Sequence, residues 1–141
     1  MLKKIDPRLS PDLLYVLYCM GHGDEIVLSD AHFPAHTVNK NIIRADGNQV
    51  EELLEAILPL FELDSYVPDS VVMMSVNNGD SYPDSVIESY KKRLPPGQEI
   101  TFIERFEFYE RTKAASVVVV TSSIKKYGNI LLKKGVTPSD Y

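Results

Sequence analysis

Short, mostly apolar runs alternate along the chain with segments in which apolar residues recur at three- and four-residue intervals. Short apolar runs are typical of buried strands, whereas the three- and four-residue intervals are typical of one face of a helix. The sequence therefore predicts strands at 25–29, 70–76, 99–104, 116–121 and 130–133, with either a strand or a loop anchor at 42–43. It predicts helices at 11–20, 46–58, 83–94 and 105–115.

Capping residues and turn residues mark the ends of several predicted elements. Ser10 and Pro11 are typical of the first positions of a helix. Gly21 is placed to end that helix in a left-handed conformation. The sequence Asn-Asn-Gly-Asp at 77–80 predicts a turn between a strand and the next helix.

The order of these elements predicts an α/β fold. Strands that alternate with helices form a mostly parallel sheet covered on both faces. The short link between the strands at 116–121 and 130–133 predicts an antiparallel pair, so the sheet should be mixed. The 141 residues contain no repeat and no linker, which indicates a single domain over 1–141.

Charge and composition narrow the classes of partner. The chain has 20 acidic and 15 basic side chains, a formal net charge of −5, which argues against nucleic acid as the main partner. No apolar core typical of a signal sequence follows Met1, and the longest aliphatic run, 117–120, is far shorter than the ~20 residues that span a bilayer. Cys19 lies on an apolar helical stripe and predicts a core residue in a reducing compartment. We therefore expect a cytoplasmic protein without a membrane partner.

All three histidines lie in the segment 21–36, together with several carboxyl groups. His22 stands between two glycines and before a predicted buried strand. Because an imidazole gives and takes protons near neutral pH, this position indicates acid–base chemistry on a small molecule. The alternative is a histidine that only satisfies the last carbonyls of the preceding helix.

The sequence contains no motif typical of nucleotide binding, of a cysteine pair or of a serine nucleophile. There is no glycine-rich phosphate-binding loop, no Cys-x-x-Cys pair and no nucleophile elbow. His32 and His36 have the spacing of two ligands on a helix, but Pro34 between them predicts a loop over 30–37. We therefore expect no metal site and interpret the two histidines, His36 more clearly than His32, as loop residues that hydrogen-bond the backbone or line an interface.

Several longer motifs resemble those of one known family. They are M-G-H-G-D-E-I at 20–26, S-D-A-H-F-P-A-H at 29–36, I-R-A-D-G at 43–47, L-F-E-L-D-S-Y at 60–66, R-F-E-F-Y-E-R at 105–111 and K-Y-G-N-I-L-L-K-K-G-V-T-P at 126–138. Together they resemble the L-fucose mutarotase family, which is related to the ribose pyranases. The resemblance runs from Leu2 to Pro138.

The resemblance implies a fold and an activity. It implies a three-layer α/β/α sandwich, closed rings of subunits that are often decamers, and exchange between the α and β anomers of a free sugar without metal or organic cofactor. Arg105 stands where the ribose branch usually has histidine, which favours the fucose branch. A ribose-type pyranase and a non-catalytic sugar-binding module remain the alternatives.

The resemblance also implies roles for five residues. The proton donor of the family falls on His22, and its substrate contacts fall on Asp30, Arg105, Tyr127 and Asn129. Without the resemblance, Asp30 would be interpreted as a turn residue, Arg105 as a partner in a surface ion pair, and 127–129 as an ordinary connection between strands.

One geometric argument does not depend on the resemblance. His22 and Asp30 are eight residues apart with a strand between them, a separation of up to about 26 Å at roughly 3.3 Å per residue. A monosaccharide cannot bridge that distance. Either the chain folds back sharply at Gly23, or the two residues meet across two subunits. We favour the second arrangement, in which a homo-oligomer completes the site.

Overall fold

The computed structural model describes residues 1–83 and 85–141. Within these residues the strands are β1 (Glu25–Ser29), β2 (Ile42–Ala45), β3 (Val71–Met74), β4 (Thr101–Ile103), β5 (Val117–Thr121) and β6 (Ile130–Lys133). The helices are α1 (Pro11–Cys19), α2 (Ala35–Val38), α3 (Val50–Ile57), α4 (Val86–Arg93) and α5 (Arg105–Ala114), with a 3₁₀ turn at Leu58–Leu60. The predicted strands and all four predicted helices are confirmed, with ends that differ by a few residues, and α2 is an additional short helix.

The strands form one sheet in the order β2-β5-β1-β6-β3-β4. The pairs β1–β5, β2–β5 and β3–β4 are parallel, and β6 is antiparallel to both β1 and β3. Five strands therefore run in one direction and β6 in the other, which confirms a mostly parallel, mixed sheet. The prediction that β5 and β6 pair with each other is wrong, because their connection crosses the end of β1 and places β6 on its far side.

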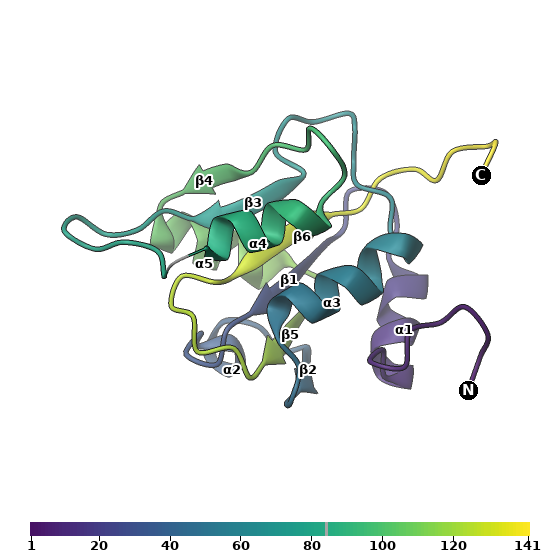
Figure 1. Ribbon diagram of the computed structural model, residues 1–141, viewed down its shortest axis with the longest axis horizontal. Coiled ribbons are helices and arrows are strands. Elements are labelled where there is room, and N and C mark those ends of the chain that lie inside the picture. Colours follow the sequence, from purple (N-terminus) through teal and green to yellow (C-terminus); the bar gives the residue numbers. More distant parts are fainter. Residues whose placement is uncertain (84) are drawn as a thin grey trace.

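Helices cover both faces of this sheet. Side chains along a strand point alternately to the two faces, and in β1 Ile26 and Leu28 join one hydrophobic cluster while Val27 joins the other. The first cluster contains residues of α1, α3 and α4, and the second contains residues of α2 and α5. In Figure 1, α3 and α4 lie in front of the sheet and α5 lies behind it. The predicted three-layer α/β/α sandwich is confirmed.

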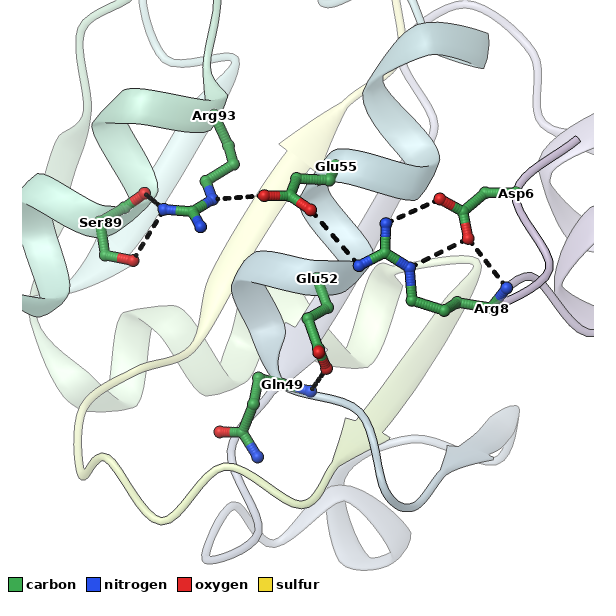
Figure 2. Close-up of polar contacts among 7 residues, drawn as sticks. All are labelled: Asp6, Arg8, Gln49, Glu52, Glu55, Ser89 and Arg93. Atoms are coloured by element: carbon green, nitrogen blue, oxygen red, sulfur yellow. Dashed lines mark hydrogen bonds and ion pairs between the residues drawn. The ribbon is translucent and has the colours of Figure 1, made fainter. Parts of the chain in front are cut away.

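An exposed polar network links the helices of the first layer (Figure 2). Glu55 of α3 accepts hydrogen bonds from Arg8, at 3.3 Å, and from Arg93 of α4, at 3.1 Å. Arg8 also donates to Asp6 at 2.7 Å. Exposed ion pairs contribute little each, typically below about 1 kcal/mol, so this network orients the N-terminal segment more than it stabilises the fold.

The capping of α3 differs from the prediction. The sequence at 46–48 predicts the start of this helix, but α3 begins at Val50. Its N-cap is Gln49, whose backbone N–H donates to Glu52 at 2.7 Å (Figure 2). The predicted start of the next helix at Pro83 and Asp84 falls partly outside the described residues, because Asp84 is not described.

Three local predictions near the N-terminus are wrong. Gly21 does not end α1 in a left-handed conformation, because Met20 is an extended C-cap and Gly23 takes the positive φ, +89°, instead. The loop predicted at 30–37 contains the single-turn helix α2, with Pro34 at its N-cap, a position that needs no intrahelical N–H bond. Cys19 is exposed rather than part of the core, since it stands at the last residue of α1.

None of the helices in the described part of the chain is long and apolar enough to span a membrane.

Candidate functional site

A cavity of about 250 Å³ opens where the parallel strands reach their carboxyl ends. Asp30 follows β1, Asn77 lies beyond β3, and Arg105 lies two residues after β4. Tyr127 and Asn129 come from the connection that leads into β6, which starts at the same edge because it runs in the opposite direction. Open α/β sheets commonly bind ligands at this edge.

Asp30 is the most buried carboxyl group of the cavity lining, with 2% of its surface exposed. Its Oδ1 accepts hydrogen bonds from the backbone N–H groups of His32 and Phe33, both at 2.9 Å, so Asp30 has the turn role that the sequence indicates without the resemblance. Burial nevertheless raises the pKa of Asp30 above its ordinary value, against the effect of these bonds. A carboxyl group with a raised pKa inside a cavity is a candidate for proton exchange near neutral pH.

Arg105 lines the cavity without a carboxylate partner among the described residues. Its Nε is buried and has no hydrogen-bond partner within that part of the chain. The surface ion pair considered as the alternative for Arg105, with Glu104 or Glu107, is absent there. Glu104 Oε2 instead caps α5, accepting from the N–H groups of Phe106 and Glu107 at 2.8 and 3.2 Å. The guanidinium carbon lies 4.7 Å from the centroid of the Phe106 ring, so an aromatic face holds the cation and leaves its donors to a ligand.

The connection at 127–129 is more constrained than an ordinary link between strands. Tyr127 has a φ of +62°, a left-handed conformation that is uncommon for a residue other than glycine. Asn129 is buried, and its Oδ1 accepts the backbone N–H of Asp30 at 2.8 Å. This bond joins the residue that follows β1 to the connection that leads into β6, and both residues line the cavity.

Asp80 and Lys126 are lining residues that the sequence did not indicate. Asp80 accepts a hydrogen bond from Lys126 Nζ at 2.6 Å and one from the Tyr127 hydroxyl at 2.9 Å. The Lys126 bond is the largest of the contacts that lower the pKa of Asp80 to about 2, so Asp80 is a carboxylate at neutral pH. His32 also lines the cavity, whereas His36 is not among its lining residues.

His22 lies at the opposite edge of the sheet, before β1 begins. The turn that carries it is fixed to the end of β6, since Gly23 N donates to Lys134 O at 2.8 Å. β1 spans about 16 Å at roughly 3.3 Å per residue, so the turn at Gly23 does not bring His22 to the cavity. Within one subunit the structure thus brings Asp30, Arg105, Tyr127 and Asn129 together and leaves His22 apart.

The His22 ring makes its own set of contacts. Nε2 lies 3.2 Å from Asp64 Oδ1, and the ring packs edge-to-face on Tyr66 with 5.1 Å between centroids. Asp64 is the partner of the ring, in place of the helix carbonyls considered from the sequence. A hydrogen bond from the Tyr66 N–H, and then that of His22, lower the pKa of Asp64. An ionised Asp64 can accept a hydrogen bond from Nε2, which leaves Nδ1 as the ring nitrogen for proton transfer.

Gly135 fixes the backbone beside Asp64. A Cβ at this position would lie 2.6 Å from Leu63 O and 2.8 Å from Asp64 Cα, which are backbone atoms that cannot move independently. We expect Gly135→Ala to lower the free energy of unfolding by about 1–3 kcal/mol, measured by urea denaturation. Gly21→Ala is the control, because the nearest atom to its Cβ is Asp24 Oδ2 at 3.7 Å. Equal stability of the two variants would contradict the prediction.

Comparison with known proteins identifies the family. The model of the RbsD / FucU transport protein family matches residues 3–137. The chain belongs to this family. It is 54% identical over 142 residues to the L-fucose mutarotase of Haemophilus influenzae, covering 98% of this chain and 99% of that protein. The resemblance deduced from the sequence motifs is therefore confirmed.

Solved structures of RbsD / FucU proteins share the fold. The fucose mutarotase of Streptococcus pneumoniae, crystallised in complex with L-fucose, superposes with a TM-score of 0.91 at 44% identity, over 97% of this chain and 100% of that chain. Bacillus subtilis RbsD complexed with D-ribose superposes with a TM-score of 0.78 at 21% identity, over 98% and 100% of the two chains, and shows the fold alone.

Proposed function

We propose that this protein is an L-fucose mutarotase, an isomerase that interconverts the α and β anomers of free L-fucose. The family members named above support the activity and the sugar. The observation that carries the proposal is that one small cavity is lined both by a buried carboxyl group, Asp30, and by the guanidinium of Arg105, whose Nε has no hydrogen-bond partner among the described residues. Such a cavity matches an uncharged ligand that carries many hydroxyl groups.

The exchange proceeds through opening of the sugar ring. A base removes the proton of the anomeric hydroxyl while an acid protonates the ring oxygen, the bond between C1 and the ring oxygen breaks, and an aldehyde forms at C1. Rotation about the C1–C2 bond and closure on the other face of the aldehyde give the second anomer. The reaction transfers only protons, so this mechanism assigns no metal and no organic cofactor to the site.

Each residue of the site has a role in this scheme. His22 is the proton donor to the ring oxygen, and Asp30 takes the proton of the anomeric hydroxyl. Arg105 donates to sugar oxygens, and Asn129 can both donate and accept, as sugar hydroxyls do. Tyr127 offers an apolar ring face to the less polar side of a deoxy sugar.

Because His22 lies at the other edge of its own subunit, we propose that the partner subunit's His22 completes the cavity. The side chain of His22 is 43% exposed, and Tyr66 beside it is exposed as well, so both are accessible to a second copy. Phe106, next to the lining residue Arg105, and Phe102, which packs on Tyr82, are exposed aromatic residues that a second copy could cover. Head-to-tail contacts of this kind close into rings, and we propose a ring-shaped homo-oligomer, a decamer, which acts in the cytoplasm.

Exchange NMR tests the proposed function. Magnetisation transfer between the anomeric protons of L-fucose is measured with and without the protein, and the same is done for D-ribose. We expect the protein to accelerate transfer for fucose well above its effect on ribose. Faster pyranose–furanose exchange of ribose would favour the ribose-type alternative. Shifted or broadened fucose signals without transfer would make the protein a binding module and overturn the proposal.

A further inference from the structure

Tyr90 does not line the cavity, but it contacts the connection 127–129, from which two lining residues come. It belongs to α4, in the helical layer on the face of the sheet away from α5, and it is fully buried. Its hydroxyl donates a hydrogen bond to the carbonyl oxygen of Gly128 at 2.8 Å. Burial raises the pKa of Tyr90 well above its usual range, so the hydroxyl keeps the proton that it donates. A buried hydroxyl is costly to desolvate, and this bond offsets the cost.

The acceptor of this bond stands between two proposed substrate contacts. Gly128 separates Tyr127 from Asn129, and its own N–H donates to Lys125 O at 3.0 Å. A Cβ on Gly128 would lie 2.7 Å from Lys125 O and 3.0 Å from the Tyr90 hydroxyl oxygen. The loop is therefore folded tightly against Tyr90, and its position depends on where that hydroxyl lies.

A second residue of the same layer holds the start of the loop. Glu51 of α3 accepts a hydrogen bond from Lys125 Nζ at 2.8 Å through Oε1. Its Oε2 is buried and has no hydrogen-bond partner among the residues that the structure describes. Two helices that do not line the cavity, α3 and α4, thus hold the segment 125–128 through hydrogen bonds to its first and last residues.

We propose that Tyr90 is a positioning residue of the sugar site, acting through the Gly128 carbonyl on Tyr127 and Asn129. This inference rests on the proposed function. Because Asn129 also accepts the N–H of Asp30, the hydroxyl of Tyr90 sets the spacing between the loop and the proposed proton acceptor. Glu51 supports the same loop at Lys125. The two residues on either side of Gly128, Tyr127 and Asn129, are proposed to bind the sugar rather than to transfer protons, so the expected effect falls mainly on binding.

The test is Tyr90→Phe, which keeps the ring and removes the hydroxyl. We expect KM for L-fucose, from the concentration dependence of anomer exchange, to rise about five- to tenfold while kcat changes less than about twofold. The dissociation constant of fucose from calorimetric titration should rise by the same factor. Thr112→Val is the control, since it also removes a buried hydroxyl that donates to a carbonyl, that of Phe108 at 2.8 Å, away from the loop.

The outcomes separate this inference from the proposed function. Unchanged KM and dissociation constant in Tyr90→Phe, or equal rises in Tyr90→Phe and Thr112→Val, would overturn the inference. Wild-type protein that binds fucose without exchanging its anomers would refute the mutarotase, and the titration would still decide the role of Tyr90. If Tyr90→Phe does not fold, Glu51→Gln, which weakens the bond to Lys125, should raise the dissociation constant, and an unchanged value would overturn the inference.

Discussion

Replacing His22 with alanine is expected to slow the exchange of L-fucose anomers by about 10²–10⁴-fold, the usual contribution of one positioned acid–base group. His22 stands in an exposed turn that the backbone fixes to Lys134, so its loss should leave the subunit folded. Magnetisation transfer between the anomeric protons measures the rate, and circular dichroism checks the fold.

His36→Ala is the matched control, because His36 is also an exposed histidine and is not among the residues that line the cavity. It should exchange anomers at the wild-type rate. A His22→Ala variant as active as His36→Ala would remove the imidazole from the mechanism.

Mixing two inactive variants tests whether the site is shared between subunits. Co-expressed His22→Ala and Asp30→Asn subunits should form oligomers in which about a quarter of the sites combine a wild-type His22 with a wild-type Asp30, if the two come from different chains. Exchange should then return to a corresponding fraction of the wild-type rate. No recovery in oligomers shown to contain both variants would contradict a site that two subunits share.

The strands could be predicted because a buried strand has a recognisable pattern of apolar residues in the sequence. β1 and β5 are buried on both faces, so their apolar residues are consecutive, and both lie close to the predicted limits. The neighbour of β6 was not predictable in the same way. A short connection favours pairing with the preceding strand, but 122–129 crosses the end of β1, held there by the bond from Ala31 N to Ser123 O at 2.7 Å.

Some residues of the candidate site could likewise be predicted from the sequence, and others could not. A carboxyl group directly after a buried strand, such as Asp30, has a place in the fold that the sequence can predict. Asp80 carries only the signal of a turn, and Tyr90 only that of an apolar helix face, so nothing local distinguishes either from its neighbours. Their contacts with 126–128 join segments about 40 residues apart, which no local pattern encodes.

Asp30→Asn is expected to lower the exchange rate by at least about 10²-fold, because the amide cannot take the proton of the anomeric hydroxyl. Asparagine keeps an oxygen that can accept the N–H groups of His32 and Phe33, so the turn after β1 should persist. Loss of activity without loss of the fold would identify proton transfer, rather than local structure, as the function of this carboxyl group. A variant that retains the wild-type rate would contradict the assignment.

The same substitution should make the protein more stable at neutral pH. Burial raises the pKa of Asp30 in the folded state, so the ionised carboxyl group costs folding free energy above that pKa and ceases to do so once it is protonated. The advantage of Asp30→Asn in free energy of unfolding should therefore be largest near pH 7 and shrink as pH falls through the raised pKa. Urea denaturation across this range measures it.

Asp46→Asn provides a control of opposite sign. The hydrogen bond from Arg44 lowers the pKa of Asp46, so its ionised form favours folding and its replacement should lower stability at neutral pH. The loss of stability in Asp46→Asn should shrink as pH falls through the lowered pKa, because the wild-type carboxylate is then protonated and no longer stabilises the fold. If Asp30→Asn behaved like Asp46→Asn, the buried carboxylate would be a stabilising group, and the argument that the fold keeps a costly charge at the cavity for proton transfer would fail.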